Sequence, residues 1–159
     1  MKNILVTRID DRLIHGQVVT AWIKRYPINR ILIIDDELSK NKLMERIYKA
    51  AAPVGVEVII MDQEDAIDFL KEDPLVKENV MILVKIPQIL EALLRAGIKV
   101  PKIILGGMGA KAGRMTFNKN VSANEEEREC FKRIIGSGVE ICYQLVPGDK
   151  EVNIRKLLS

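Results

Sequence analysis

Short apolar runs rich in β-branched residues alternate along the chain with longer amphipathic stretches. The runs fall at residues 4–7, 30–34, 56–61, 80–84, 102–105 and 139–146. Strands that alternate with helices are joined by right-handed crossovers and form a mainly parallel sheet. The near-continuous apolar character of 31–34 and 58–61 is typical of strands covered on both faces. We therefore predict a three-layer α/β/α sandwich with a mainly parallel central sheet.

Helix signals fill the intervals between these runs. Ser39 can cap a helix over 40–51, and Asp62 or its neighbours can begin one over 64–70. Pro87 suits the first turn of the next helix, which Gly97 can end in a left-handed cap. Further helices are expected over 15–23, over 124–135, where Asn124 and Glu127 resemble a capping box, and over the 149–158 tail.

The length and composition indicate one soluble domain over residues 1–159. Hydrophobic residues make up 48% of the chain and charged residues 30%, as in an ordinary globular protein. No apolar run approaches the roughly 20 residues needed to cross a bilayer. The N-terminus lacks the long apolar stretch and cleavage site of a signal peptide. We expect a cytoplasmic protein.

Several function classes have no support in the sequence. Cys130 and Cys142 lack CxxC spacing, and the chain has one histidine, so neither a metal site nor redox chemistry is predicted and both cysteines are expected to be buried free thiols. The net charge is only +3 and aromatic residues are 4% of the chain. Without a basic run interleaved with aromatics, nucleic-acid binding is not expected.

The single histidine stands in the run Arg8-Ile-Asp-Asp-Arg-Leu-Ile-His15-Gly-Gln, just after an apolar strand. A neutral imidazole is a good nucleophile because its pKa of about 6.5 leaves a lone pair free near neutral pH. Arg8 and Arg12 offer planar donor forks that could neutralise a phosphoryl group on His15. If the strand ends near Thr7, residues 8–14 form a loop where α/β sheets bind ligands. The pattern predicts a phosphoryl-transfer site.

The neighbours of His15 suggest supporting roles. Gly16 and Gln17 would open the next helix, so their backbone N–H groups could bind the phosphate. Asp10 and Asp11 would repel a phosphoryl group if they faced it. We expect at least one of them to hold an arginine or the imidazole N–H, with capping of the loop as the alternative.

Three further segments are candidates for the site or for contacts with a partner. Asp35 ends the second strand, where it either joins the site or leads into the next helix. Gly106 and Gly107 follow an apolar strand and could approach a phosphate or a partner, with a flexible loop as the alternative. Lys111 and Arg114 are candidates for docking a partner. The segment fits neither the Walker nor the GxGxxG pattern, so no nucleotide site is predicted.

The His15 run closely resembles the phosphorylation-site segment of the IIB subunits of the mannose/fructose/sorbose class of the bacterial phosphoenolpyruvate-dependent sugar phosphotransferase system. The likeness continues nearly end to end, through Ile33-Ile-Asp-Asp-Glu37, Ala50-Ala-Ala-Pro53, Leu105-Gly-Gly-Met108 and Val146-Pro147. The resemblance implies a phosphoryl-carrier enzyme in which Nδ1 of His15 accepts the group from a IIA partner and passes it to a sugar. It also implies membrane IIC and IID partners, peripheral association with that permease and a possible homodimer.

Two other classes of protein compete with this interpretation. A receiver-like signalling module phosphorylated on aspartate would use Asp10, Asp11 and Asp62 as an acidic pocket. However, the strand over 102–105 does not end in the lysine that such a pocket requires. A non-catalytic module would bind a phosphorylated partner without acquiring phosphate. Under the leading hypothesis the arginines supply the positive charge, so we expect no metal and no cofactor.

Overall fold

The computed structural model describes residues 1–158. In chain order its elements are β1 (Ile4–Asp10), α1 (Gly16–Arg25), β2 (Arg30–Ile34), the 3₁₀ helix η1 (Leu38–Lys40), α2 (Lys42–Ala50), β3 (Glu57–Met61), α3 (Gln63–Lys71), β4 (Val80–Val84), α4 (Pro87–Arg95), β5 (Ile103–Gly107), β6 (Met115–Asn118), β7 (Val121–Ala123), α5 (Glu125–Gly136), β8 (Ile141–Tyr143), β9 (Val152–Asn153) and the 3₁₀ helix η2 (Ile154–Leu157).

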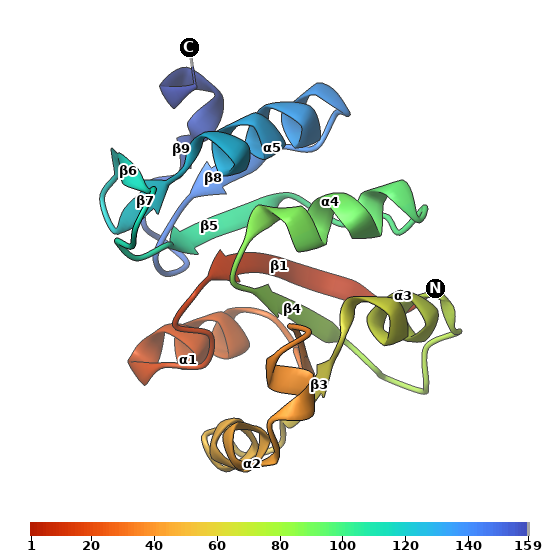
Figure 1. Ribbon diagram of the computed structural model, residues 1–159. Coiled ribbons are helices and arrows are strands. Elements are labelled where there is room, and N and C mark those ends of the chain that lie inside the picture. Colours follow the sequence, from red (N-terminus) through yellow and green to blue (C-terminus); the bar gives the residue numbers. More distant parts are fainter. Residues whose placement is uncertain (159) are drawn as a thin grey trace.

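One sheet of seven strands organises the molecule, in the order β3-β2-β4-β1-β5-β8-β9. Six of the strands are parallel, and β9 runs antiparallel to β8 at one edge. β1 lies in the middle, between β4 and β5 (Figure 1). A central strand is protected on both edges and both faces, so side chains on β1 can be buried completely.

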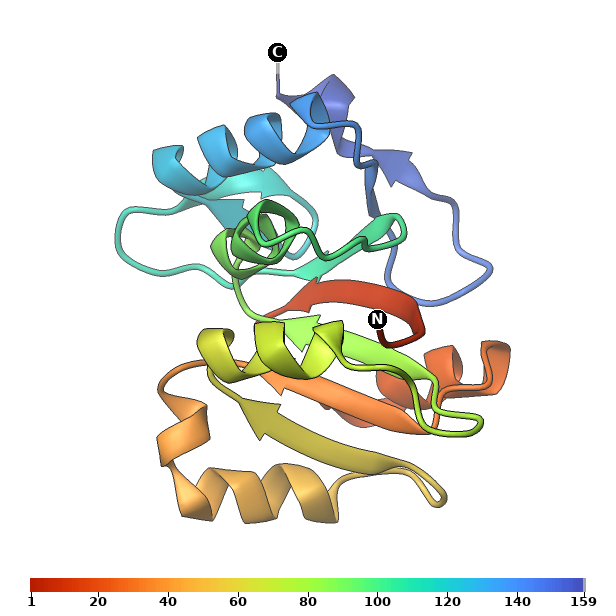
Figure 2. The ribbon, with the colours of Figure 1, turned by 90° about the vertical axis from the view of Figure 1, so that its right-hand side faces the viewer.

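Helices cover both faces of the sheet (Figure 2). α1 and α2 pack over one face, around a core that includes Val19, Trp22 and Ile31. α3, α4 and α5 pack over the other face, where Phe131 is among the largest buried side chains. Each fully buried side chain of this size stabilises the fold by about 1.5–3 kcal/mol. The predicted three-layer α/β/α sandwich is confirmed.

Most predicted helix signals are found where the sequence places them. Asp62 caps α3 by accepting a hydrogen bond from the backbone N–H of Asp65 at 2.8 Å. Asn124 and Glu127 form a reciprocal capping box at the start of α5. Pro87 is the first residue of α4, where its missing N–H costs no helical hydrogen bond.

The predicted helix over 40–51 and the cap at Ser39 are wrong in detail. Asn41 has an extended backbone and caps α2 through a 3.0 Å hydrogen bond from the N–H of Met44. This break separates α2 from the short turn η1. Ser39 lies in that turn and donates its hydroxyl to the Asp36 carbonyl instead.

Near the two ends of the chain, the strands and helices also begin and end at other residues than predicted. β1 continues past Thr7 to Asp10, so part of the predicted 8–14 loop belongs to the strand. The predicted strand over 139–146 is shorter, because only 141–143 pair with β5. The tail over 149–158 is not one helix, since Val152 and Asn153 pair with β8 before the single turn of η2. The β6–β7 hairpin was not predicted, because its strands have only four and three residues and β6 has no buried residue.

The burial of the two cysteines predicts low reactivity. Cys130 in α5 and Cys142 in β8 are free and buried. Burial, together with Glu91 near Cys130 and Glu140 near Cys142, raises the pKa of each thiol to about 12. Since the thiolate is the reactive form, an aromatic disulfide reagent at about pH 8 should label both cysteines quickly in denaturant and very slowly in the native protein. Fast native labelling would contradict this.

Candidate functional site

The predicted site lies at the carboxyl ends of β1 and β5, which are neighbours in the sheet (Figure 1). β1 leads through α1 towards β2, whereas β5 leads through α5 to β8 on the opposite side. The chain therefore leaves adjacent strands in opposite directions, which is where open α/β sheets bind ligands. Asp10 pairs with Gly107 here, and the N–H of Asp11 donates to the Gly107 carbonyl at 3.0 Å.

His15 stands immediately before α1 as its N-cap residue. Its backbone is extended, and its side chain makes no capping hydrogen bond to the helix. Leu13 anchors the preceding turn in the core, although its φ of +57° is uncommon for a residue with a side chain. Gly16 follows with φ +47°, which glycine adopts without steric cost. The imidazole is left 22% exposed and free to bond outside the helix.

The carboxylate of Asp10 is the centre of the site. Its side chain is 0% exposed. Arg12 donates to it from the backbone N–H at 3.1 Å, from Nε at 3.0 Å and from Nη2 at 3.1 Å. Nη2 of Arg8 contacts it at 3.2 Å and Nε2 of His15 at 3.0 Å. One buried carboxylate thus orients two guanidinium groups and the imidazole.

These contacts set the ionisation of Asp10 and the tautomer of His15. Burial of the Asp10 carboxyl favours its neutral form, but the hydrogen bond from Arg12 and the charge of Arg8 outweigh it, so the pKa of Asp10 lies below its ordinary value. An ionised carboxylate only accepts hydrogen bonds, so the hydrogen of a neutral His15 ring must sit on Nε2. Nδ1 then carries the free lone pair.

Arg8 lies inside β1 and not in the expected loop. Its side chain is 1% exposed, and Nη1 donates to the backbone carbonyl of Gln144 at 2.9 Å. The guanidinium also lies 5.6 Å from the centre of the Trp22 ring, within cation–π range. Burial lowers the pKa of Arg8, while the charge of Asp10 opposes that change. Arg8 therefore contacts Asp10 from the interior of the protein. This role differs from the expected one, which was direct contact with a phosphoryl group.

Arg12 occupies the outer side of Asp10. Its side chain is 45% exposed, so a group arriving from solvent can reach it. Two of its nitrogens hold Asp10, which fixes the plane of the guanidinium. Gly16 and Gln17, the first residues of α1, are exposed beside His15. The structure therefore places an arginine and a helix N-terminus around the imidazole.

Gly106 and Gly107 are buried at the end of β5 and do not form a flexible loop. A Cβ atom on Gly106 would lie 2.1 Å from Nη2 of Arg8. A Cβ on Gly107 would lie 2.9 Å from Nη2 of Arg12. The two glycines therefore make room for the two guanidinium groups, a role that differs from the expected contact with phosphate or partner.

Asp11 and Arg114 face each other outside the Asp10 cluster. The Asp11 carboxylate accepts a hydrogen bond from the N–H of Gly109 at 2.7 Å. Arg114 is 2% exposed and pairs with Glu127 and Asp11. A guanidinium that is buried and paired within the chain is poorly placed for the expected docking role, whereas Lys111 on the same loop is exposed.

Asp35 and Asp62 lie away from His15. Asp35 directly follows β2, which lies two strands or about 10 Å from β1. It accepts hydrogen bonds from the N–H groups of Glu37 and Leu38 at 3.1 and 2.9 Å. It therefore leads into η1, the alternative that the sequence left open. Asp62 directly follows β3, which lies three strands or about 14 Å from β1. The acidic pocket that a receiver-like module needs is not assembled.

Sequence reasoning missed three contributors to the site. The Gln144 carbonyl and the Trp22 ring contact Arg8, and Glu127 holds Arg114. A backbone carbonyl carries no sequence signal. The Trp22 ring carries no sequence signal for a contact with Arg8, and Glu127 was recognised only as part of a capping box, so these contacts depend on tertiary structure.

The described residues 1–158 contain no cluster of three or more histidine, cysteine, aspartate or glutamate side chains that could hold a metal ion. Within the same residues, no helix has both the length and the apolar character needed to span a membrane.

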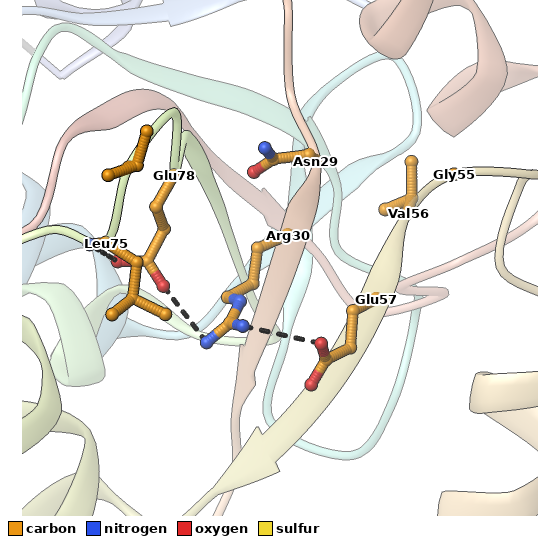
Figure 3. Close-up of a pocket in the computed structure, with 8 residues that line it drawn as sticks. Asn29, Arg30, Gly55, Val56, Glu57, Leu75 and Glu78 are labelled. Carbon is orange, nitrogen blue, oxygen red and sulfur yellow. Dashed lines mark hydrogen bonds and ion pairs between the residues drawn. The ribbon is translucent and has the colours of Figure 1, made fainter.

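A cavity of about 590 Å³ lies at the opposite end of the sheet, beside the first residues of β2 and β3. Figure 3 shows Arg30 between two carboxylates, Glu78 at 3.0 Å and Glu57 at 3.4 Å. Glu78 is also held by Lys2 at 2.8 Å. The charges in this cavity are satisfied by one another, and none of its lining residues belongs to the His15 site.

A family model described as the sorbose subfamily IIB component of the phosphotransferase system matches residues 4–159. The chain is 34% identical over 151 residues to the sorbose-specific EIIB component of Lacticaseibacillus casei, which covers 95% of this chain and 92% of the relative. It is 32% identical over 154 residues to the mannose-specific EIIAB component of Escherichia coli K12, covering 97% of this chain and 48% of the relative. The chain thus spans about half the length of the curated mannose-specific relatives it matches.

The fold is also similar to a solved structure. The crystal structure of the IIBSor domain of the sorbose permease from Klebsiella pneumoniae aligns with a TM-score of 0.92 and 30% sequence identity. The alignment covers 98% of this chain and 96% of that one. The similarity therefore includes the whole sheet and both helical layers.

The tight fit at Gly106 predicts a clear cost for a single methyl group. Gly106→Ala should lower the free energy of unfolding by about 1–3 kcal/mol, because Arg8 must move away from Asp10. Gly136→Ala is the matched control, since a Cβ there meets nothing within 4 Å. That change, at the end of α5, should raise stability by about 0.5–1 kcal/mol. Urea unfolding measures both, and equal stability of the two variants would contradict the packing argument.

The lowered pKa of Asp10 predicts an acid-sensitive fold. Its stabilising contribution is fully present above the unfolded pKa of about 3.9 and is lost as the pH falls through the lower folded pKa. Asp10→Asn should destabilise the protein by about 3–5 kcal/mol at neutral pH, because Arg8 stays buried without its partner. Its unfolding free energy should then depend less on pH between about pH 2 and 5. Parallel pH curves for variant and wild type would count against this role.

Proposed function

The chain belongs to the sorbose subfamily of IIB components of the phosphotransferase system, and on that premise we propose that it is a single-domain phosphoryl carrier for sugar uptake. His15 accepts the phosphoryl group from a IIA partner and passes it to the sugar. The observation that supports this most directly is the 3.0 Å contact between Nε2 of His15 and the Asp10 carboxylate. It leaves Nδ1 as the nucleophile and a buried negative charge behind the ring.

In the first step, the lone pair of Nδ1 forms a bond to phosphorus while the bond from phosphorus to the IIA donor atom breaks. The electron pair of the broken bond returns to the donor. The imidazole of His15 gains positive charge and keeps its hydrogen on Nε2. Asp10 stabilises that charge through the same hydrogen bond, without needing to accept the proton.

Arg12 and the start of α1 bind the group being transferred. Phosphoryl transfer depends mainly on position and on neutralisation of charge at the oxygens. Arg12 is held by Asp10 through Nε and Nη2, which directs its remaining N–H groups towards a phosphoryl oxygen. The N–H groups of Gly16 and Gln17 offer further donors at the positive end of the helix dipole. This positive charge comes from the chain itself and needs no metal or cofactor.

In the second step, a sugar hydroxyl oxygen attacks phosphorus and the P–N bond breaks. The electron pair returns to Nδ1, and the proton of the attacking hydroxyl passes to water. The sugar would be presented by membrane IIC and IID subunits, with the IIB protein on the cytoplasmic side and bound peripherally to that permease. A phosphohistidine suits this relay because its P–N bond stays reactive.

Direct phosphorylation tests the proposal. The purified protein is incubated with phosphoenolpyruvate, the general phosphotransferase proteins and a sorbose- or mannose-class IIA, and its intact mass is followed. Wild type should gain one phosphoryl group that is lost in acid and survives alkali. His15→Ala should gain none.

Arg12→Lys separates charge from geometry in the same assay. Lysine keeps the positive charge but cannot hold Asp10 and a phosphoryl oxygen with one planar fork. The transfer rate should fall at least about tenfold, because complete removal of one oriented donor costs about a hundred- to a thousandfold in rate. Unchanged transfer would remove Arg12 from the mechanism. A gain of phosphate that persists in His15→Ala would instead favour an aspartyl phosphate.

A further inference from the structure

Arg114 connects the end of β1, the loop after β5 and the start of α5. Its Nε and Nη2 donate to the two carboxylate oxygens of Glu127 at 3.0 and 2.8 Å. Its Nη1 donates to the carbonyl of Gly109 at 2.9 Å and lies 3.5 Å from the carboxylate of Asp11. The side chains of Arg114 and Glu127 are 2% and 3% exposed. We refer to Asp11, Gly109, Arg114 and Glu127 as the clasp.

The Asp11 side of the clasp belongs to the segment that carries the site. Asp11 directly follows Asp10 and begins the segment that ends at His15. Its carboxylate accepts from the N–H of Gly109 at 2.7 Å, and its own N–H donates to Gly107 at 3.0 Å. The start of the His15 segment is therefore hydrogen-bonded both to the last residue of β5 and to the loop that follows it.

The Glu127 side of the clasp cannot shift easily. Oε1 of Glu127 also accepts the backbone N–H of Asn124 at 2.9 Å, as part of the capping box of α5. Moving this carboxylate would break the helix cap and the pair with Arg114 together. A bidentate arginine–carboxylate pair is also specific in its geometry. The clasp thus ties the start of the His15 segment to the rigid N-terminal end of α5.

We propose that Arg114 is a positioning residue for transfer at His15. It touches neither Asp10 nor the imidazole, but it fixes Asp11 and hence the loop between Asp10 and His15. The inference rests on the proposed phosphoryl-carrier function and adds a residue to it. A shift of about 1 Å in a reacting group can cost up to about a hundredfold in rate, so a loose loop would slow transfer without removing any catalytic group.

Two conservative variants test the two sides of the clasp. Arg114→Lys keeps the charge and loses the fork. Asp11→Asn keeps an acceptor for the N–H of Gly109 and loses the charge that faces Arg114. In single-turnover transfer from phosphorylated IIA, each should lower the maximal rate about tenfold and leave the half-saturating IIA concentration unchanged. The double variant should be no slower than the slower single variant, because both changes open one clasp.

Arg133→Lys is the matched control for Arg114→Lys, since it also keeps the charge and loses a two-nitrogen contact, here with Glu91 at the exposed side of α5. It should transfer at the wild-type rate. Circular dichroism must show every variant folded at the assay temperature. If Arg114→Lys does not fold, Asp11→Asn carries the test, because Asp11 is partly exposed.

The tautomer of the imidazole is a second measurement, and it does not depend on the overall stability of the protein. The chain has one histidine, so ¹⁵N-edited spectra of the ring report His15 alone. Wild type should show hydrogen on Nε2, whereas the clasp variants should show a larger share of the Nδ1–H form. Wild-type rates and spectra in both variants would overturn the inference, as would a weaker affinity for IIA at an unchanged maximal rate. Failure of the wild type to accept phosphate would overturn the proposed function instead, and the spectra would still test the clasp.

Discussion

The buried carboxylate of Asp10 is the interaction on which the site depends. A carboxylate that is removed from water is stable only when charged donors surround it. Arg8, Arg12 and His15 provide those donors, and each is oriented in return. The same contacts that keep Asp10 ionised therefore decide which nitrogen of His15 carries the hydrogen. Stability and chemistry are coupled at this residue.

The two arginines have different roles because they are buried to different extents. Arg8 is enclosed by Trp22, the Gln144 carbonyl and the space left by Gly106, so it belongs to the core. Arg12 is half exposed and can meet an incoming anion. Because both arginines contact Asp10, a displacement of Arg8 would shift Asp10 and with it Arg12. A site on the surface is thereby connected to the centre of the sheet.

The loops around the site are bonded to rigid elements on each side. Trp22 in α1 donates to the Leu145 carbonyl at 3.1 Å, which joins the first helix to the segment after β8. The clasp joins Asp11 to the start of α5. Together these contacts place the His15 segment between two helices that pack on opposite faces of the sheet. That arrangement requires the topology in which β1 lies at the centre beside β5.

The sequence by itself determined the sandwich, most helix caps and the gathering of charged residues around His15, because those features depend on local periodicity and on residues within one run. It left open whether Asp10 or Asp11 orients the imidazole. Only the tertiary structure decided the length of β1, the burial of Arg8 and the use of Arg114 within the chain. Pairing with β4 and β5 extends β1 by three residues to Asp10, and Arg8, which lies within this extension, is buried. Gly106 lies about 100 residues and Gln144 136 residues from Arg8 in the chain. Glu127 contacts Arg114 across the β6–β7 hairpin. No local pattern could therefore reveal these contacts.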